Sequence, residues 1–320
     1  MAKHFADRML DAIEEKQAPL CIGLDPMYER MPKQIREIAA KAKGGLGEQA
    51  AAAREFCQSV IDIVAGQVPC IKLQNACFER CGPMGLKAYF EVVDYAHENG
   101  LLVIGDIKRA DIGSTAAAYA TAHLEEVFIG EGESEHPVAV DAITVNPYFG
   151  IDGVQPFIDL AKVGGQGVLV VVRTTNPSAK DFQDIRDGEN RRVFERIAER
   201  VNDWANQAGC VGDSGYSLVG AVVGATYPED TKALRELMPN SLLLVPGVGA
   251  QGGTMADASL AFHDDGWGAL VTVSRSVIYA WERPEYQHLG EVNWEDAIEV
   301  AVVDAKASLA EALARRAAMA

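Results

Sequence analysis

The sequence predicts a closed (β/α)8 barrel, in which eight parallel strands alternate with helices. Eight apolar, β-branched runs of strand length recur along the 320 residues, and a stretch of helical periodicity follows each of them. The runs are apolar on both faces, as in a parallel sheet that helices cover on both sides. No long linker divides the chain, so we expect one domain over residues 1–320. A doubly wound open sheet is the competing architecture.

The predicted strands are short runs in which Val, Ile and Leu dominate. In chain order they are Leu20–Leu24, Pro69–Leu73, Leu101–Ile107, Val138–Val145, Val168–Val172, Leu218–Val223, Leu242–Val245 and Ala269–Val273.

The predicted helices repeat their apolar residues every three to four positions, and several are followed by Gly or Asn, which favour helix ends. In chain order they are Arg54–Val64, Leu86–His97, Ala116–Phe128, Val154–Ala161, Arg191–Asn206, Pro228–Leu237, Met255–Phe262 and Trp294–Arg315.

Three stretches show neither the strand nor the helix periodicity and are polar, charged or glycine-containing. They are residues 31–47, 130–136 and 180–190. We expect loops or short helices there. The first follows the first strand and the third follows the fifth strand. Both therefore belong to the side on which such barrels keep their active sites.

The composition excludes several classes of function. A formal net charge of -17 argues against a nucleic-acid-binding or anionic-membrane-binding surface. The six cysteines show no paired metal-ligand spacing, and Cys77 and Cys81 are the only close pair, so we expect no metal site. The N-terminal residues carry acids and lack a long apolar stretch, so no signal peptide or membrane span is expected and a cytoplasmic location is predicted.

Chemically capable side chains gather where the predicted strands end, which is where barrels of this class carry function. They are Asp25, Lys72, Asn75, Asp106, Lys108, Asn146, Arg173, Thr174, Thr175, Thr226, Gln251 and Arg275. None of the six histidines lies at such an end, so proton transfer is expected to rest on Asp and Lys.

The segment from Gly105 to Thr115 places Asp106, Lys108 and Asp111 directly after a buried run. In an extended chain, residues two apart share a face, so Asp106 and Lys108 are expected to project together. A lysine flanked by carboxylates stays cationic, which suits proton donation better than Schiff-base chemistry. The alternative is a surface salt bridge with an ordinary helix cap, formed by Asp111 or Ser114.

The segment from Pro246 to Gly253 satisfies the pattern G-x-G-x-x-G after a strand and before a helix. It follows the seventh predicted strand, and the next strand ends in Ser274-Arg275 rather than in the acid that would hold an adenosine ribose. In a (β/α)8 barrel the loops after strands seven and eight commonly bind phosphate, so we predict a phosphate monoester site with Arg275 as an added donor. A purely structural glycine turn is the alternative.

Together these motifs resemble the orotidine 5'-phosphate decarboxylase family. The resemblance rests on Gly23-Leu-Asp-Pro26, Ile71-Lys-Leu-Gln-Asn75, Asp106-Ile-Lys-Arg-Ala-Asp111-Ile-Gly-Ser-Thr115, Pro246-Gly-Val-Gly-Ala-Gln251 and Ser274-Arg-Ser276. The segments Val145–Gly150 and Thr174–Pro177 resemble the longer bacterial (type 2) branch. The match runs in order from the first strand to the eighth.

The resemblance implies conversion of orotidine 5'-phosphate to uridine 5'-phosphate (UMP) in pyrimidine biosynthesis, without a metal or an organic cofactor. It implies that Lys108 stabilises the C6 carbanion and supplies the proton, and that Asp106 faces the departing carboxylate. Lys72 and Asp25 would hold the ribose hydroxyls and complete the charge array.

The resemblance also implies a homodimer with shared active sites, in which Asp111, Ile112 and Thr115 serve the neighbouring subunit. Thr175 would contact the pyrimidine ring, and Gln251 and Arg275 would grip the phosphate. Pro246 and Gly252 would also bind the substrate. The loops after Thr175 and after Gly249 are candidates for segments that close over the substrate. Ala110 and Thr175 stand where this branch often has Gly and Ser, and neither change removes a group that the mechanism needs.

Two rival functions stay open. A keto-gulonate phosphate decarboxylase or hexulose phosphate synthase shares Asp-x-Lys-x-x-Asp but uses magnesium held partly by a glutamate after the second strand, and Glu79 lies in that neighbourhood. A non-catalytic phosphate-binding barrel is the other alternative.

Overall fold

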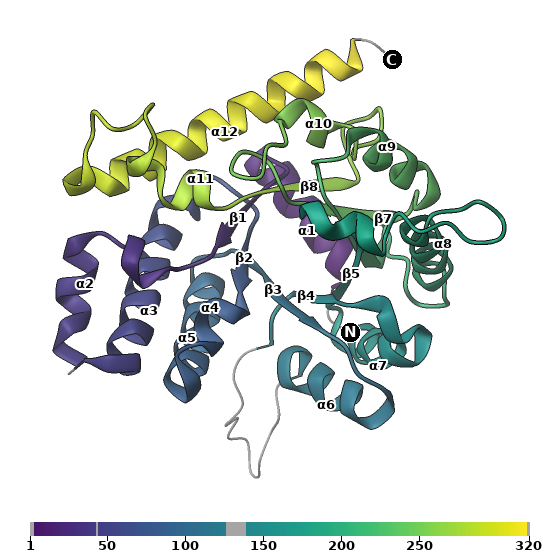
Figure 1. Ribbon diagram of the computed structural model, residues 1–320, viewed down its shortest axis with the longest axis horizontal. Helices are drawn as coiled ribbons and strands as arrows, with labels where there is room; N and C mark the ends of the chain where they lie inside the picture. Colours follow the sequence, from purple (N-terminus) through teal and green to yellow (C-terminus); the bar gives the residue numbers. More distant parts are fainter. Residues whose placement is uncertain (1–2, 43, 126–138, 319–320) are drawn as a thin grey trace. The chain divides into compact units, whose positions relative to one another are not determined.

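The computed structural model is a closed barrel in which eight strands follow one another in chain order, and it describes residues 3–42, 44–125 and 139–318. The predicted (β/α)8 fold is therefore confirmed (Figure 1). The strands are β1 Leu20–Leu24, β2 Cys70–Gln74, β3 Leu102–Arg109, β4 Ala142–Val145, β5 Gly167–Arg173, β6 Ser217–Val223, β7 Ser241–Val245 and β8 Ala269–Val273.

Helices connect the strands along the whole described chain. They are α1 Phe5–Lys16, α2 Lys33–Ala39, α3 Gly45–Val64, α4 Asn75–Glu79, α5 Gly82–Glu98, α6 Gly113–Leu124, α7 Ile151–Gly164, α8 Val193–Ala205, α9 Pro228–Leu237, α10 Met255–Ser259, α11 Arg275–Ile278 and α12 Trp294–Ala317. Helix α1 was not anticipated, although Phe5 and Met9 lie four residues apart and are both buried.

The irregular stretches were expected to hold loops or short helices, and two of them contain short helices. Residues 31–47 contain α2 and the start of α3, which begins well before the predicted Arg54. Residues 180–190 stay irregular beyond a short 3₁₀ helix at Pro177–Asp181. The fourth strand begins at Ala142 rather than Val138, and the predicted loop at 130–136 lies outside the described residues.

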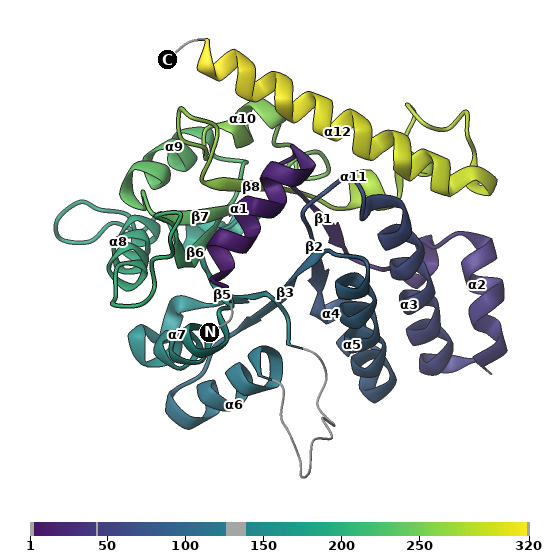
Figure 2. The same cartoon turned by 180° about the vertical axis from the view of Figure 1, so that it is seen from behind.

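The chain divides into two compact units, which are described separately. The smaller unit comprises Ala12–Ile107 and Val273–Ala307. Within it, α3 lies between α2 and α5 (Figures 1 and 2). Its core is aromatic: the Phe56 ring stacks on Tyr279 with 5.7 Å between centroids, and Trp281 and Trp294 pack against Phe56.

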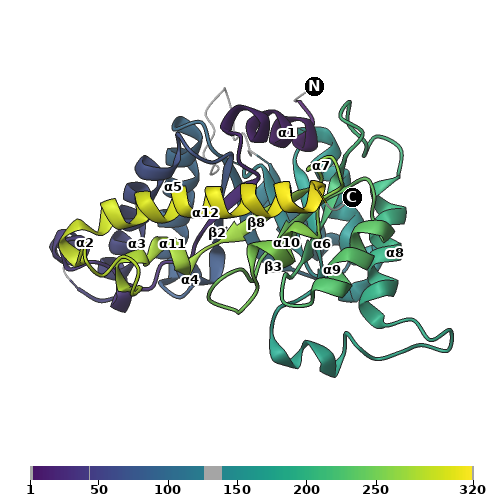
Figure 3. The same ribbon diagram turned by 90° about the horizontal axis from the view of Figure 1, so that it is seen from above.

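The larger unit comprises Met1–Asp11, Lys108–Thr272 and Ser308–Ala320. Within it, α6 packs beside α7, and α8 packs against α9 and β6. The segment that precedes α8 projects away from α8 and α9 (Figure 3). In the described part of the chain, no helix is both long and apolar enough to cross a membrane.

Close packing between β6 and its neighbours depends on Gly220. A Cβ atom at this position would lie 2.4 Å from the Leu242 carbonyl oxygen and 2.6 Å from Cδ2 of Leu169. The first of these atoms belongs to the backbone of a buried strand, so it has little freedom to move. The position therefore requires glycine for close approach.

We predict that Gly220→Ala lowers the free energy of unfolding by about 1–3 kcal/mol, because overpacking forces the strands apart. Thermal unfolding monitored by circular dichroism measures this change. Gly188→Ala is the matched control, because a Cβ at Gly188 meets nothing within 4 Å. Equal unfolding temperatures for the two variants would contradict the packing argument.

Candidate active site

A buried lysine paired with two carboxylates lies in the smaller unit. Lys72 of β2 is 6% exposed, and its Nζ lies 2.8 Å from Oδ2 of Asp106 and 3.7 Å from Oδ1 of Asp25. Asp106 belongs to β3, and Asp25 directly follows β1. The structure thus brings together three of the residues that the strand ends predict.

The charges of this cluster support one another. Burial alone would lower the pKa of Lys72, but the carboxylates of Asp106 and Asp25 outweigh that effect and raise it. Lys72 therefore stays an ammonium ion at neutral pH. A fixed cation and a fixed anion side by side in a water-poor position form a preorganised electrostatic site.

Gln74 joins the cluster, and sequence reasoning gave it no role. Its Nε2 donates to Oδ2 of Asp106 at 3.1 Å. Gln74 and Asp106 are register partners in the parallel β2–β3 pair, which explains how they meet. The spacing within one strand does not reveal such a partner, because the contact depends on how two strands pair.

The turn after β1 is held by the aromatic core. The Tyr279 hydroxyl donates to the Asp25 carbonyl at 3.1 Å and accepts from the Met27 N–H at 2.7 Å. A Cβ at Gly23 would come 1.8 Å from Oγ of Ser274, so Gly23 lets the segment after β8 approach β1 closely. The next residue, Arg275, is exposed.

Lys108 lies in the larger unit and has an unusual backbone. Its φ is +46°, in the left-handed region, and its side chain is exposed. The prediction that Asp106 and Lys108 share a face assumed an extended chain, and the backbone is not extended at Lys108, so simple alternation does not place this side chain. Its backbone N–H donates to Oγ1 of the buried Thr144 at 3.1 Å.

The residues after β3 do not form the helix cap that was considered as an alternative. Helix α6 has Ile112 as its N-cap residue, without a side-chain cap bond. Asp111 Oδ1 accepts instead from the N–H of Ile112 at 2.8 Å. Ile112 is 59% exposed and Thr115 is also exposed, so all three predicted residues lie near the surface of the larger unit.

The glycine-rich loop after β7 adopts backbone angles that glycine accommodates more readily than other residues. Gly247, Gly249 and Gly252 have φ values of 103°, 79° and 94°, which side chains disfavour. A Cβ at Gly247 would lie 2.7 Å from Cγ2 of Thr175 and 3.5 Å from Oε1 of Gln251. Thr175, which follows β5, and Gln251 therefore both lie close to Gly247.

Arg173 anchors the segment that begins with Thr174 and Thr175. The guanidinium is 2% exposed and lies 2.8 Å from Oδ1 of Asp184 and 3.0 Å from Oδ2 of Asp230. Gln183 reinforces this connection, because its Oε1 accepts from the Thr174 N–H at 3.1 Å. Asp184 lies in the segment between β5 and α8, and Asp230 lies in the first turn of α9, so one arginine connects this segment to a helix.

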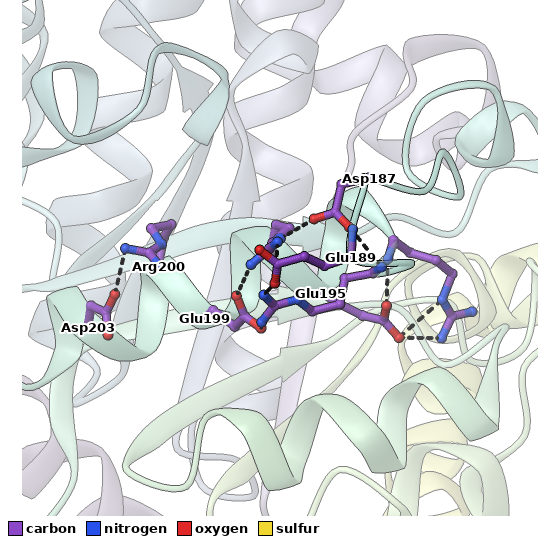
Figure 4. Close-up of polar contacts among 9 residues, drawn as sticks. Asp187, Glu189, Glu195, Glu199, Arg200 and Asp203 are labelled. Carbon is purple, nitrogen blue, oxygen red and sulfur yellow. Dashed lines mark hydrogen bonds and ion pairs between the residues drawn. The ribbon is translucent and has the colours of Figure 1, made fainter.

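The rest of this segment is covered by surface ion pairs that continue into α8 (Figure 4). Glu189 lies 3.1 Å from Arg196, which also contacts Asp187. The backbone N–H of Arg191 donates a hydrogen bond to Asp187, and the Arg196 side chain donates another. These bonds lower the pKa of the Asp187 carboxyl, and the Arg191 bond has the larger effect. Single exposed pairs contribute little to stability, but here several charges form one network.

Glu79, the magnesium ligand considered among the rival functions, has a partner in the protein. Its Oε1 accepts from Nδ2 of the buried Asn75 at 3.0 Å, and both residues belong to α4. Over residues 3–42, 44–125 and 139–318, no group of three or more His, Cys, Asp or Glu side chains is arranged to hold a metal ion.

Comparison with known proteins identifies the family of the chain. Residues 18–286 match the model of the orotidine 5'-phosphate decarboxylase / HUMPS family. An orotidine 5'-phosphate decarboxylase of Rhodopirellula baltica is 42% identical over 302 residues, covering 93% of this chain and 96% of the relative. One of Caldicellulosiruptor bescii is 36% identical over 306 residues, covering 93% and 99%.

A solved structure is similar as well. The Leishmania donovani OMP decarboxylase superposes with a TM-score of 0.72 at 28% identity, covering 97% of this chain and 98% of that one. The family match spans most of the chain, and both curated relatives exceed 30% identity over nearly their full length. The chain therefore belongs to the orotidine 5'-phosphate decarboxylase / HUMPS family of enzymes.

Proposed function

We propose that this protein decarboxylates orotidine 5'-phosphate to UMP in pyrimidine biosynthesis, without a metal or an organic cofactor. Family membership supports the reaction. The observation that carries the mechanism is the buried Lys72 ammonium held by Asp106 and Asp25, with Lys108 two residues beyond Asp106 along β3. Such a charge array suits a reaction that develops negative charge on carbon.

The chemistry needs one bond cleavage and one proton transfer. The bond between C6 and the carboxylate breaks, carbon dioxide leaves, and the electron pair stays on C6. The Lys108 ammonium lies beside this carbanion and then donates a proton to C6, after which water reprotonates the amine. No conjugated electron sink is available at C6, so fixed charges are the main source of transition-state stabilisation.

The other members of the array hold and orient the substrate. Asp106 faces the substrate carboxylate, and Lys72 and Asp25 bind ribose hydroxyls. Lys72 can do so while staying charged, because Asp106 balances it at 2.8 Å. The pair therefore supplies a donor and an acceptor whose positions are set before the substrate arrives.

The phosphate and the base are held by separate loops. Pro246, Gln251, Gly252 and Arg275 bind the phosphate, and Thr175 contacts the pyrimidine ring. The exposed Arg275 guanidinium makes no ion pair with any described residue, which leaves it available to an anion. Binding far from the reacting carbon can drive closure of the loops after Thr175 and Gly249.

We also propose a homodimer in which Asp111, Ile112 and Thr115 serve the neighbouring active site. The surface around them supports an interface, because Tyr148 is 88% exposed and Phe149 47% exposed. Phe149 and the Asp111 carbonyl both crowd Gly153, so they share one surface. Clustered exposed aromatic residues are typical of protein interfaces.

The first prediction is that chelator-treated protein consumes orotidine 5'-phosphate, and that Lys108→Ala reduces kcat by at least ~10³-fold. The loss of the orotate absorbance follows the reaction. Magnesium should not change the rate, whereas a magnesium-dependent member of the wider family would require it. Ligand binding by the unmodified chain without turnover would favour the non-catalytic barrel.

The second prediction concerns the shared active site. Lys108→Ala and Asp111→Asn should each be nearly inactive alone, but a 1:1 mixture refolded together should regain about a quarter of the unmodified activity. A mixed dimer has one site with both residues intact. If Asp111 acts within its own subunit, mixing restores nothing, and that result would rule out the shared site.

The third prediction concerns the phosphate. Arg275→Ala should weaken UMP binding by about 10–100-fold, because a charge-assisted hydrogen bond is lost, and should leave uridine binding unchanged. Isothermal titration calorimetry measures both. Arg200→Ala is the control, because Arg200 is an exposed residue of α8 that pairs with Asp203. Equal weakening of UMP and uridine binding would argue against a phosphate contact.

A further inference from the structure

The backbone of Lys108 is in a conformation that its position in the fold does not explain. Only three described residues other than glycine have positive φ: Gln17, Lys108 and Asn190. Gln17 directly follows α1, where a left-handed residue often ends a helix, and Asn tolerates this conformation. Lys108 lies within β3 and is neither a helix-ending residue nor an asparagine, so neither explanation applies to it. Strain of this kind is characteristic of functional positions.

Two hydrogen bonds, one from β4 and one from the residue that follows it, flank the Lys108–Arg109 peptide. Oγ1 of Thr144 accepts from the Lys108 N–H at 3.1 Å, and the N–H of Asn146 donates to the Arg109 carbonyl at 3.0 Å. Thr144 is 1% exposed, in a strand whose four residues are all buried. A strand N–H usually donates to a carbonyl of the adjacent strand, so acceptance by a side-chain hydroxyl is a local exception.

We propose that Thr144 is a positioning residue for Lys108. Its hydroxyl accepts from the Lys108 N–H, and so it helps to set the direction in which the lysine side chain leaves the strand. This inference rests on the proposed function, in which the Lys108 ammonium must lie beside C6. Thr144 itself touches no reacting atom in this role and acts only through the backbone of Lys108.

The inference predicts a specific pattern of kinetic effects. Thr144→Val keeps the shape of the side chain but removes the acceptor, which frees the Lys108 backbone to move. A displacement of about 1 Å at a reacting group can cost ~100-fold in rate, so kcat should fall about 10–100-fold. The KM and the affinity for UMP should stay within about threefold, because separate loops grip the phosphate. Thr144→Ser keeps the hydroxyl and should retain most of kcat.

Thr272→Val is the matched control. Thr272 is a strand threonine, 4% exposed, whose hydroxyl has no hydrogen-bond partner among the described residues. Its replacement should leave kcat unchanged. Thermal unfolding of every variant separates loss of position from loss of stability. If Thr144→Val does not fold, Thr144→Ala removes the same hydroxyl, and comparison with Thr144→Ser decides the question.

The unmodified protein is assayed first, so that two failures can be told apart. If it does not turn over orotidine 5'-phosphate, the proposed function fails. If it is active and Thr144→Val has the same kcat, or if Thr144→Ser loses as much as Thr144→Val, the positioning role is overturned. Amide exchange of selectively ¹⁵N-labelled lysine gives a readout that needs no activity: the Lys108 amide should exchange faster in Thr144→Val, and unchanged exchange would also overturn the role.

Discussion

The structure of the site depends on one constraint: the ammonium group of Lys72 is buried and must be neutralised. An unpaired buried cation is strongly unfavourable, so Asp106 at 2.8 Å is required by stability as well as by any chemistry. The strand register satisfies this requirement. Gly23 stands opposite Lys72 in the β1–β2 pair, and Gln74 stands opposite Asp106 in the β2–β3 pair. The three adjacent strands thus hold these charges in a fixed pattern.

Aromatic packing also fixes the turn that contains Asp25. The Tyr279 hydroxyl bonds both to the carbonyl of Asp25 and to the N–H of Met27, while its ring stacks on the buried Phe56. Burial raises the pKa of Tyr279, so its hydroxyl stays a neutral group that can donate and accept at once. The turn that presents Asp25 is therefore part of the hydrophobic core and not a free loop.

The sequence predicted the parts of the molecule that follow from local periodicity and from the ends of strands. The alternation of apolar runs and helical stretches was sufficient for the (β/α)8 barrel, and strand ends were sufficient to select Asp25, Lys72 and Asp106. Contacts that depend on how two strands pair could not be predicted from the sequence. The bond from Gln74 to Asp106 needs the register of two strands. The sequence did not reveal the positive φ of Lys108. Glycine and asparagine are the residues that commonly adopt this conformation, and lysine gives no such signal.

Charge distribution explains why the binding groups must be local. A chain with a net charge of -17 repels a phosphate ester at long range, so attraction must come from groups in direct contact. Many of its arginines are already committed: Arg173 holds Asp184 and Asp230, and Arg196 holds Asp187. Arg275 has no such partner among the described residues, whereas the N–H groups of Gly249, Gly252 and Gly253 already donate to carbonyls of the glycine loop. An acidic protein can therefore bind an anion where its cations are unpaired, which is the basis of the role proposed for Arg275.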